Sequence, residues 1–177
     1  GVVGHPVGHS LSPALHSWAY AHLGVPAVYM QWDISPEDFD AFMVAVRVLP
    51  IGGVSVTLPH KQRVIPYLDH ITPEAMSIGA VNTLLWRHGE LWGANTDCEG
   101  ILRPLQERSI EPGSALILGA GGACLAAVAA LRAMGCPNIF LAARDRTKAA
   151  SVVHGSDIHY VPWEDRGACA VDVLINS

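Results

Sequence analysis

The apolar and polar positions of the first half of the chain predict short strands separated by helices. Apolar runs near residues 2–3, 28–32 and 54–56 predict strands. Ser12-Pro13 and the acidic segment 35–38 read as two helix starts, with Ser12 as an N-cap. One face of the first helix would carry the apolar side chains of Leu15, Trp18, Ala19 and Leu23.

The second half alternates strands and helices more regularly. After a hairpin around Arg87-His88-Gly89, a helix over residues 97–108 precedes an apolar strand at 115–118. A long helix, a strand at 139–142 and further strands follow, and this alternation favours parallel β-α-β units. The sequence therefore predicts an α/β fold with a first domain over residues 1–98 and a second over 99–177. We expect the second domain to be incomplete at its C-terminus.

Composition narrows the function classes. The 177 residues are 50% hydrophobic and 15% charged, which supplies enough apolar material for a core. A net charge of −5 without a long basic run predicts no nucleic-acid or membrane partner, and no apolar run is long enough to span a membrane. The cysteines are far apart, so neither a zinc cluster nor a disulfide framework is indicated: Cys98, Cys124, Cys136 and Cys169. We expect a cytoplasmic protein that acts on a small molecule.

Two residues are candidates for proton chemistry. Lys61 follows a strand and a proline turn in an uncharged stretch, where neighbours can tune the pKa of a partly desolvated amine. Asp97 opens a predicted helix. Together they can move a proton at a carbonyl or hydroxyl carbon, and a nucleotide beside them would make that chemistry a hydride transfer. The alternatives are a surface role for Lys61 and a helix N-cap for Asp97.

Ser10 and Ser12 are candidates for binding an anion. Two hydroxyls beside a helix N-terminus suit a carboxylate, although Ser12 has the alternative role of a cap. No metal site is expected, because the histidines of this region lack the spacing and the carboxylate company of ligands: His5, His9, His16 and His22.

A glycine-rich turn predicts a dinucleotide site in the second domain. Between a buried strand and a helix lie Gly119, Ala120, Gly121, Gly122 and Ala123. In that setting backbone amides and the helix N-terminus can receive a pyrophosphate.

The end of the next strand bears on which dinucleotide is bound. Where an NAD enzyme would place an acid on the ribose, this chain has Arg144, which can grip a 2′-phosphate. NADP is therefore favoured over NAD. Asp145 keeps NAD open, and a solvated helix start is the structural alternative.

Five segments, taken in order, closely resemble the shikimate dehydrogenase family. They are Gly4-x-Pro6-x-x-His9-Ser10-x-Ser12-Pro13-x-x-His16, Val56-Thr57-x-Pro59-x-Lys61, Gly79-Ala80-Val81-Asn82-Thr83, Asn95-Thr96-Asp97-x-x-Gly100 and Gly119-Ala120-Gly121-Gly122-Ala123. The resemblance implies a substrate domain followed by a Rossmann-like NADP-binding domain. It also implies reversible NADPH-dependent reduction of 3-dehydroshikimate to shikimate in aromatic amino acid biosynthesis, by a monomer or homodimer.

Residue roles follow from the resemblance. Ser10 and Ser12 would hold the substrate carboxylate, and Lys61 with Asp97 would form the catalytic pair. The ring hydroxyls and the reacting oxygen would be bound by Thr57, Lys61, Asn82 and Asp97. NADP would contact the glycine-rich turn and Arg144.

The chain departs from the family where Ser55 stands for a frequent asparagine, and where Ala143-Arg144-Asp145 stands for Asn-Arg-Thr. Two rival functions remain open. One is a quinate/shikimate dehydrogenase using NAD or NADP, and the other is a non-catalytic module that binds a polyol acid or a nucleotide.

Overall fold

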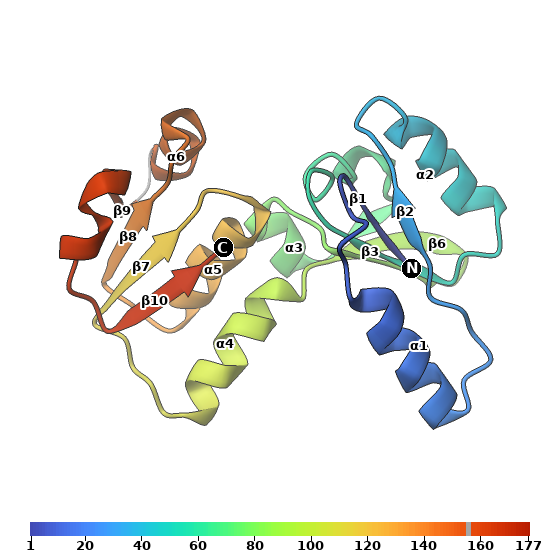
Figure 1. Cartoon of the computed structure of the whole chain (residues 1–177), viewed down its shortest axis with the longest axis horizontal. Helices are drawn as coiled ribbons and strands as arrows, with labels where there is room; N and C mark the ends of the chain where they lie inside the picture. The colour runs from blue at the N-terminus through green and yellow to red at the C-terminus, as the bar shows by residue number, and fades with distance from the viewer. Residues whose placement is uncertain (155–156) are drawn as a thin grey trace. The chain divides into compact units, whose positions relative to one another are not determined.

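The computed structural model describes residues 1–154 and 157–177, and the chain divides into two compact units. The first unit is Gly1–Asn95 and the second is Thr96–Ser177 (Figure 1). This division falls three residues before the domain boundary expected from the sequence. No helix in the described residues is long and apolar enough to cross a membrane.

The first unit contains one mixed sheet of six strands in the order β2-β1-β3-β5-β6-β4. The strands are β1 (Val2–Gly4), β2 (Gln31–Asp33), β3 (Gly53–Val56), β4 (His70–Ile71), β5 (Thr83–Arg87) and β6 (Glu90–Ala94). The helices are α1 (Ser12–Leu23), α2 (Phe39–Val48), the 3-10 turn η1 (Ile65–Tyr67) and α3 (Pro73–Ile78). Strand β1 pairs in parallel with β2 and β3, whereas β3, β5 and β6 pair antiparallel. The predicted hairpin is confirmed as β5 and β6.

Helix α2 supplies much of the core of this unit. Its buried side chains recur at helical spacing and pack against the sheet: Phe39, Phe42, Met43 and Val46. Helix α1 behaves differently, because none of its residues is buried, and Leu15 and Trp18 are 63% and 65% exposed. The expected apolar face of α1 therefore exists in the sequence but is not part of this core.

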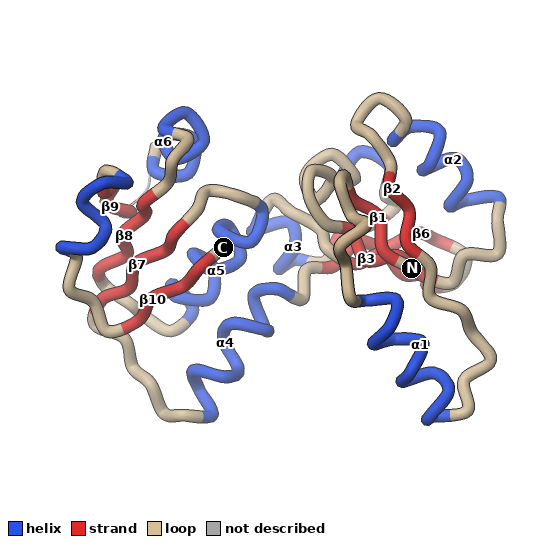
Figure 2. Tube along the Cα trace, viewed as in Figure 1, coloured by secondary structure: helices blue, strands red, loops and turns tan. Residues whose placement is uncertain are grey.

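The second unit is a parallel sheet of four strands in the order β10-β7-β8-β9 (Figure 2). Its strands are β7 (Ser114–Leu118), β8 (Asn138–Ala142), β9 (Ile158–Val161) and β10 (Val173–Asn176). Its helices are α4 (Asp97–Glu107), α5 (Gly122–Ala133), α6 (Arg146–Val153) and the 3-10 helix η2 (Trp163–Ala168). The predicted parallel β-α-β arrangement is confirmed, and the continuous apolar run of β7 suits a strand buried on both faces.

Helix starts differ in detail from the sequence expectation. Ser12 and Asp97 are the first helical residues of α1 and α4, and neither helix has a side-chain cap. The cap roles considered for these two residues are therefore wrong. Side-chain caps occur instead at Thr72, which accepts from the amide of Ala75, and at Asp145 before α6.

Candidate active site

Polar residues of the first unit gather where its central parallel strands end. Strands β1 and β3 are neighbours, so the loops that follow them leave the sheet at the same edge. The amide of Thr57 donates to the carbonyl of Val3 at 2.9 Å, and the amide of His5 donates to the carbonyl of Leu58 at 2.9 Å. These bonds fasten the loop that carries Thr57 and Lys61 to the loop that leads toward Ser10.

Asn82 joins the same edge from the strand on the other side. The amide of Val56 donates to the Asn82 carbonyl at 2.7 Å, and the amide of Val81 donates to the Lys61 carbonyl at 2.8 Å. Asn82 and Lys61 are both half-buried. These backbone hydrogen bonds therefore bring Thr57, Lys61 and Asn82 to the same edge of the sheet, although Asn82 is distant from the other two in the sequence.

Thr83 orients the Asn82 side chain. Its hydroxyl donates to Oδ1 of Asn82 at 2.7 Å, which fixes this atom as an acceptor and so orients the side-chain amide. The residue pattern placed Thr83 in a motif but gave it no role. Only the structure shows this contact, because the rotamers of adjacent side chains are not encoded in the residue pattern.

The two serines lie on the loop before α1. The amide of Ser10 donates to the Val7 carbonyl at 2.9 Å, and the amide of Ser12 donates to the Ser10 hydroxyl at 3.3 Å. Both serines are half-buried. The turn holds them two residues apart at the first turn of α1, where backbone amides without helical partners favour an anion.

His60 precedes Lys61 in the chain and was not a candidate from the residue pattern. Its side chain is fully buried, stacks on Phe39 with centroids 4.2 Å apart, and donates from Nε2 to the Ile34 carbonyl at 2.7 Å. Burial lowers the pKa of His60 and so favours the neutral imidazole. Nδ1 has no hydrogen-bond partner among the described residues. A rigid aromatic side chain thus anchors the backbone next to Lys61.

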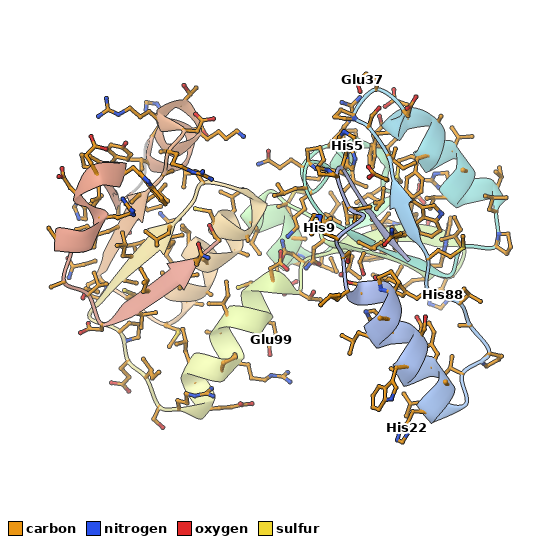
Figure 3. The ribbon with its side chains drawn as sticks, in the orientation of Figure 1. His5, His9, His22, Glu37, His88 and Glu99 are labelled. Atoms are coloured by element: carbon orange, nitrogen blue, oxygen red, sulfur yellow. The ribbon has the colours of Figure 1, made fainter. Side chains whose placement is uncertain are left out.

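His5 and Asp33 form an exposed pair near this edge. Nδ1 of His5 donates to the Asp33 carboxylate at 2.7 Å, and this hydrogen bond lowers the pKa of Asp33. Figure 3 shows His5 and His9 on the loop between β1 and α1, and His22 at the far end of α1. Among the described residues, no group of three or more histidines, cysteines or acids has the arrangement of a metal site.

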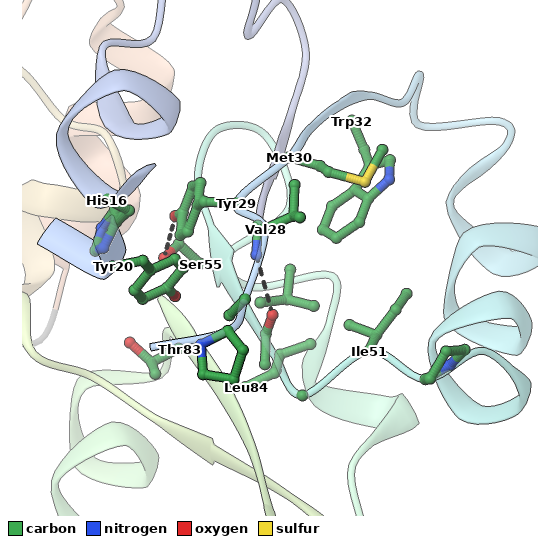
Figure 4. Close-up of a pocket in the computed structure, with 17 residues that line it drawn as sticks. His16, Tyr20, Val28, Tyr29, Met30, Trp32, Ile51, Ser55, Thr83 and Leu84 are labelled. Atoms are coloured by element: carbon green, nitrogen blue, oxygen red, sulfur yellow. Dashed lines mark hydrogen bonds between the residues drawn. The ribbon is translucent and has the colours of Figure 1, made fainter. Parts of the chain in front are cut away.

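A pocket of about 720 Å³ in the first unit includes Thr83 in its lining (Figure 4). His16, Tyr20, Tyr29 and Ser55 line one side of it, and the Tyr29 hydroxyl donates to Ser55 at 2.8 Å. None of the predicted substrate-binding residues of this unit lines it: Ser10, Ser12, Thr57, Lys61 and Asn82. Its size alone does not make it the reaction site.

A second pocket, of about 320 Å³, lies within the second unit. Asp97 at the start of α4 lines it together with Ala123 of the glycine-rich turn. Asn176 and Ser177, at the end of β10, complete its wall. The sequence analysis missed these last two residues, because only the pairing of β10 with β7 brings them beside the turn.

The glycine-rich turn has the geometry of a phosphate site. Gly119 has φ +107°, and a Cβ there would clash with the carbonyl oxygen of Ser177, so this position requires glycine. Gly121 immediately precedes α5, and a Cβ built on it would meet nothing within 4 Å. Space above Gly121 and the N-terminus of a twelve-residue helix suit the approach of a pyrophosphate.

Two physical effects act in opposite directions on the thiol of Cys124 at this turn. It lies in the first turn of α5, where the helix dipole favours a thiolate, but its side chain is fully buried. Burial dominates and raises the pKa of the thiol to about 11. Cys124 is therefore a packing residue and not a nucleophile.

Arg144 and Asp145 follow β8 and make different contacts. Asp145 Oδ1 accepts from the amides of Thr147 and Lys148 at 3.0 and 3.1 Å, so this carboxylate caps α6. Arg144 is exposed and has no carboxylate partner in the described part of the chain. The ambiguity between NAD and NADP that Asp145 raised is thereby reduced, because the acid is engaged by the helix.

Comparison with known proteins shows which family the chain resembles along its length. The family model of the shikimate dehydrogenase substrate binding domain matches residues 2–84. The curated shikimate dehydrogenase (NADP(+)) of Maridesulfovibrio salexigens is 44% identical over 177 residues. That alignment covers 100% of this chain and 65% of the relative. The chain belongs to the shikimate dehydrogenase family.

Solved shikimate dehydrogenases share the fold. The enzyme of Aquifex aeolicus superposes with a TM-score of 0.87 at 36% identity, over 99% of this chain and 66% of that chain. The enzyme of Thermus thermophilus, solved in complex with NADP(H) and shikimate, gives a TM-score of 0.83 at 39% identity over 99% and 66%. Its shikimate complex is covered to 67%. This member of the shikimate dehydrogenase family thus spans about two thirds of the length of the relatives it matches.

Proposed function

We propose that the protein catalyses the reversible NADPH-dependent reduction of 3-dehydroshikimate to shikimate, a step of aromatic amino acid biosynthesis. Relatives that match the whole chain are named for this activity with NADP(+). The observation that carries the proposal is the pocket of the second unit, which is lined by Asp97 and by Ala123, the last residue of the glycine-rich turn. A nucleotide on this turn would have a carboxylate suited to proton transfer within the same pocket.

The second unit offers groups for the two phosphate-bearing positions of the adenosine ribose of NADP. The space above Gly121 at the N-terminus of α5 receives the pyrophosphate, and the exposed guanidinium of Arg144 receives the 2′-phosphate. When bound, NADPH supplies a hydride to the carbonyl carbon of the substrate. The residues proposed to bind NADP are those that the family resemblance already indicated, namely the turn 119–123 and Arg144.

The first unit is proposed to hold the substrate. Shikimate carries one carboxylate, which suits the hydroxyls and amides of Ser10 and Ser12, and several hydroxyls, which suit polar side chains. Thr57, Lys61 and Asn82 stand at the strand edge for that purpose. The hydrogen bond from Thr83 fixes the orientation of the Asn82 side-chain amide at this edge.

Proton transfer is assigned to Lys61 and Asp97. As a hydride reaches the carbonyl carbon, negative charge develops on the oxygen, and an ammonium group there both stabilises that charge and donates the proton. Asp97 would accept a hydrogen bond from a substrate hydroxyl. Lys61 belongs to the first unit and Asp97 to the second.

Location and assembly complete the proposal. The four cysteines are unpaired in the structure, which agrees with a reducing cytoplasmic compartment: Cys98, Cys124, Cys136 and Cys169. A monomer or a homodimer is the proposed assembly.

The test is shikimate-dependent reduction of NADP⁺ by the longest natural form of the chain, run beside quinate and beside NAD⁺. We expect turnover on shikimate with NADP⁺ to exceed the three other combinations. Faster turnover on quinate would instead support a quinate/shikimate dehydrogenase. Calorimetric binding of shikimate with no turnover on either substrate would contradict the enzyme and support a binding module.

A further inference from the structure

Trp163 lies beside Arg144 because of the register between two neighbouring strands. Strands β8 and β9 are parallel, and Ala142 is opposite Val161. Arg144 and Trp163 each follow those residues by two positions, at the carboxyl edge of the sheet. The 3-10 helix η2 begins at Trp163 and follows β9 in the chain. The carboxyl edge of a parallel sheet is where nucleotides bind in such folds.

Two guanidinium groups contact the indole of Trp163. The guanidinium carbon of Arg144 is 5.9 Å from the ring centroid, and that of Arg166 is 4.2 Å from it. Arg166 also donates from Nη1 to the Trp163 carbonyl at 2.5 Å. Trp163 and Arg166 are half-buried, whereas Arg144 is exposed. Arg166 thus holds the indole of Trp163 in place, and the indole is also in contact with the guanidinium of Arg144.

The charges around this ring leave the arginines available to an anion. In the described residues neither Arg144 nor Arg166 forms an ion pair with a carboxylate, and Asp145 caps α6. Arg146 behaves differently, because its Nε contacts the Tyr160 hydroxyl at 3.4 Å. Arg144 and Arg166 therefore place two cations beside one aromatic ring, where a guanidinium can meet a phosphate.

We propose that Trp163 is a positioning residue for cofactor selectivity, which holds the guanidinium of Arg144 ready for the phosphate monoester on the adenosine ribose. Arg166 holds the indole and adds positive potential at the same edge. This inference rests on the proposed function and extends it to two residues that the family motifs do not include.

The physical reason is preorganisation. An exposed arginine samples many rotamers, and binding a phosphate removes that freedom at a free-energy cost. Stacking on an aromatic face restricts the arginine before the ligand arrives, so less freedom is lost on binding. The benefit applies only to a ligand that contacts Arg144, and NAD⁺ lacks the phosphate concerned.

The experiment compares binding of NADP⁺ and NAD⁺ by calorimetry to the longest natural form of the chain and to variants at Trp163. We expect Trp163→Leu to weaken NADP⁺ binding about fivefold and to leave NAD⁺ binding unchanged. Trp163→Phe keeps an aromatic face and restores most of the NADP⁺ affinity. Trp18→Leu, which removes an exposed tryptophan of α1, serves as the control and changes neither affinity.

A double-mutant cycle separates positioning from direct contact. If Trp163 acts through Arg144, the double variant Arg144→Ala/Trp163→Leu binds NADP⁺ as weakly as Arg144→Ala alone. Losses that multiply in the double variant would show that Trp163 contacts the nucleotide independently. Equal weakening of NADP⁺ and NAD⁺ by Trp163→Leu would show a structural role. Either result overturns the inference, whereas wild-type protein that binds neither nucleotide would contradict the proposed function itself.

Discussion

At the scale of single residues, the backbone of Lys61 is held firmly in place. The Lys61 carbonyl accepts from Val81, and the buried ring of His60 fixes the preceding residue against Phe39 and Ile34. A lysine with a fixed Cα can place its ammonium reproducibly at a reacting oxygen. This is the property that a proton donor needs.

We predict that Lys61→Ala lowers the rate constant for shikimate oxidation by about 10²–10⁴-fold, with a smaller effect on shikimate affinity. The reason is that the interaction of an ammonium with the reacting oxygen strengthens in the transition state. Steady-state kinetics with calorimetry of shikimate binding measure the two effects. Gln62→Ala, at the exposed neighbour, is the control. Equal losses in rate constant and affinity would remove Lys61 from the chemistry.

The buried thiol of Cys124 predicts how the free energy of unfolding depends on pH. Its pKa is about 11 in the folded protein and near 9.0 when exposed, so between these values the unfolded state loses a proton that the folded state keeps. The free energy of unfolding therefore falls by about 3 kcal/mol across this interval, and it is unaffected at lower pH. Urea unfolding from pH 8 upward measures it.

Cys124→Ala is the matched control for this pH effect, because alanine suits the same small site without an ionisable group. The difference between wild type and variant isolates Cys124 from other groups that titrate in this range. A difference that stays constant from neutral to alkaline pH would show that the Cys124 thiol is not desolvated.

At the scale of elements, α6 depends on the cap that Asp145 provides. Its two amide contacts satisfy donors that an eight-residue helix otherwise leaves open. The same residue invites comparison with the acid that binds ribose in NAD enzymes, and the cap explains why an acid beside Arg144 is compatible with NADP.

We predict that Asp145→Ala lowers the free energy of unfolding by about 1 kcal/mol. Asp145→Asn retains a capping oxygen, and we expect it to stay within a few tenths of wild type. Urea denaturation followed by circular dichroism gives both values. If asparagine destabilises the protein as much as alanine does, the charge of Asp145 matters and the cap is not its main contribution.

The elements also show what local pattern can and cannot predict. Strands β7 and β8 and helix α5 follow from long apolar and alanine-rich runs, and their parallel pairing follows from alternation. Helix α3 was not predicted from the sequence, although Thr72-Pro73 and Gly79 mark its start and its end. Its six residues make fewer than two turns, which is too short to show a helical period of apolar positions.

At the scale of the whole molecule, each unit has its own core. One cluster is built around α2 and the sheet of the first unit, and another is built around α5 and the parallel sheet of the second. The two clusters share no residue. Stability can therefore be changed in one unit by substitutions that do not touch the core of the other.

We predict that Leu84→Ala, at a side chain that is 1% exposed in β5, destabilises the first unit by about 2–5 kcal/mol. The loss combines buried apolar area with a cavity that the surrounding sheet fills only in part. Leu49→Ala is the same change at a side chain that is 55% exposed, and we expect it to cost little. Similar unfolding midpoints for the two variants would contradict the assigned core.

Local sequence patterns were enough to predict the α/β class, the parallel arrangement of the second half and the segments that could carry chemistry. These features depend on local periodicity, on glycine turns and on residue types at fixed spacing, which a linear chain displays directly. The roles of individual site residues stay predictions, because no ligand contact tests them.

Which residues lie together depends instead on how the folded elements pack. The contacts of Asn82 with Thr83, of His60 with Ile34 and of Arg144 with Trp163 depend on strand register and on rotamers. Asn176 reaches the pocket of Asp97 because β10 pairs with β7. Such neighbours come from distant or unpatterned positions, and packing free energy selects them only when the sheets are formed.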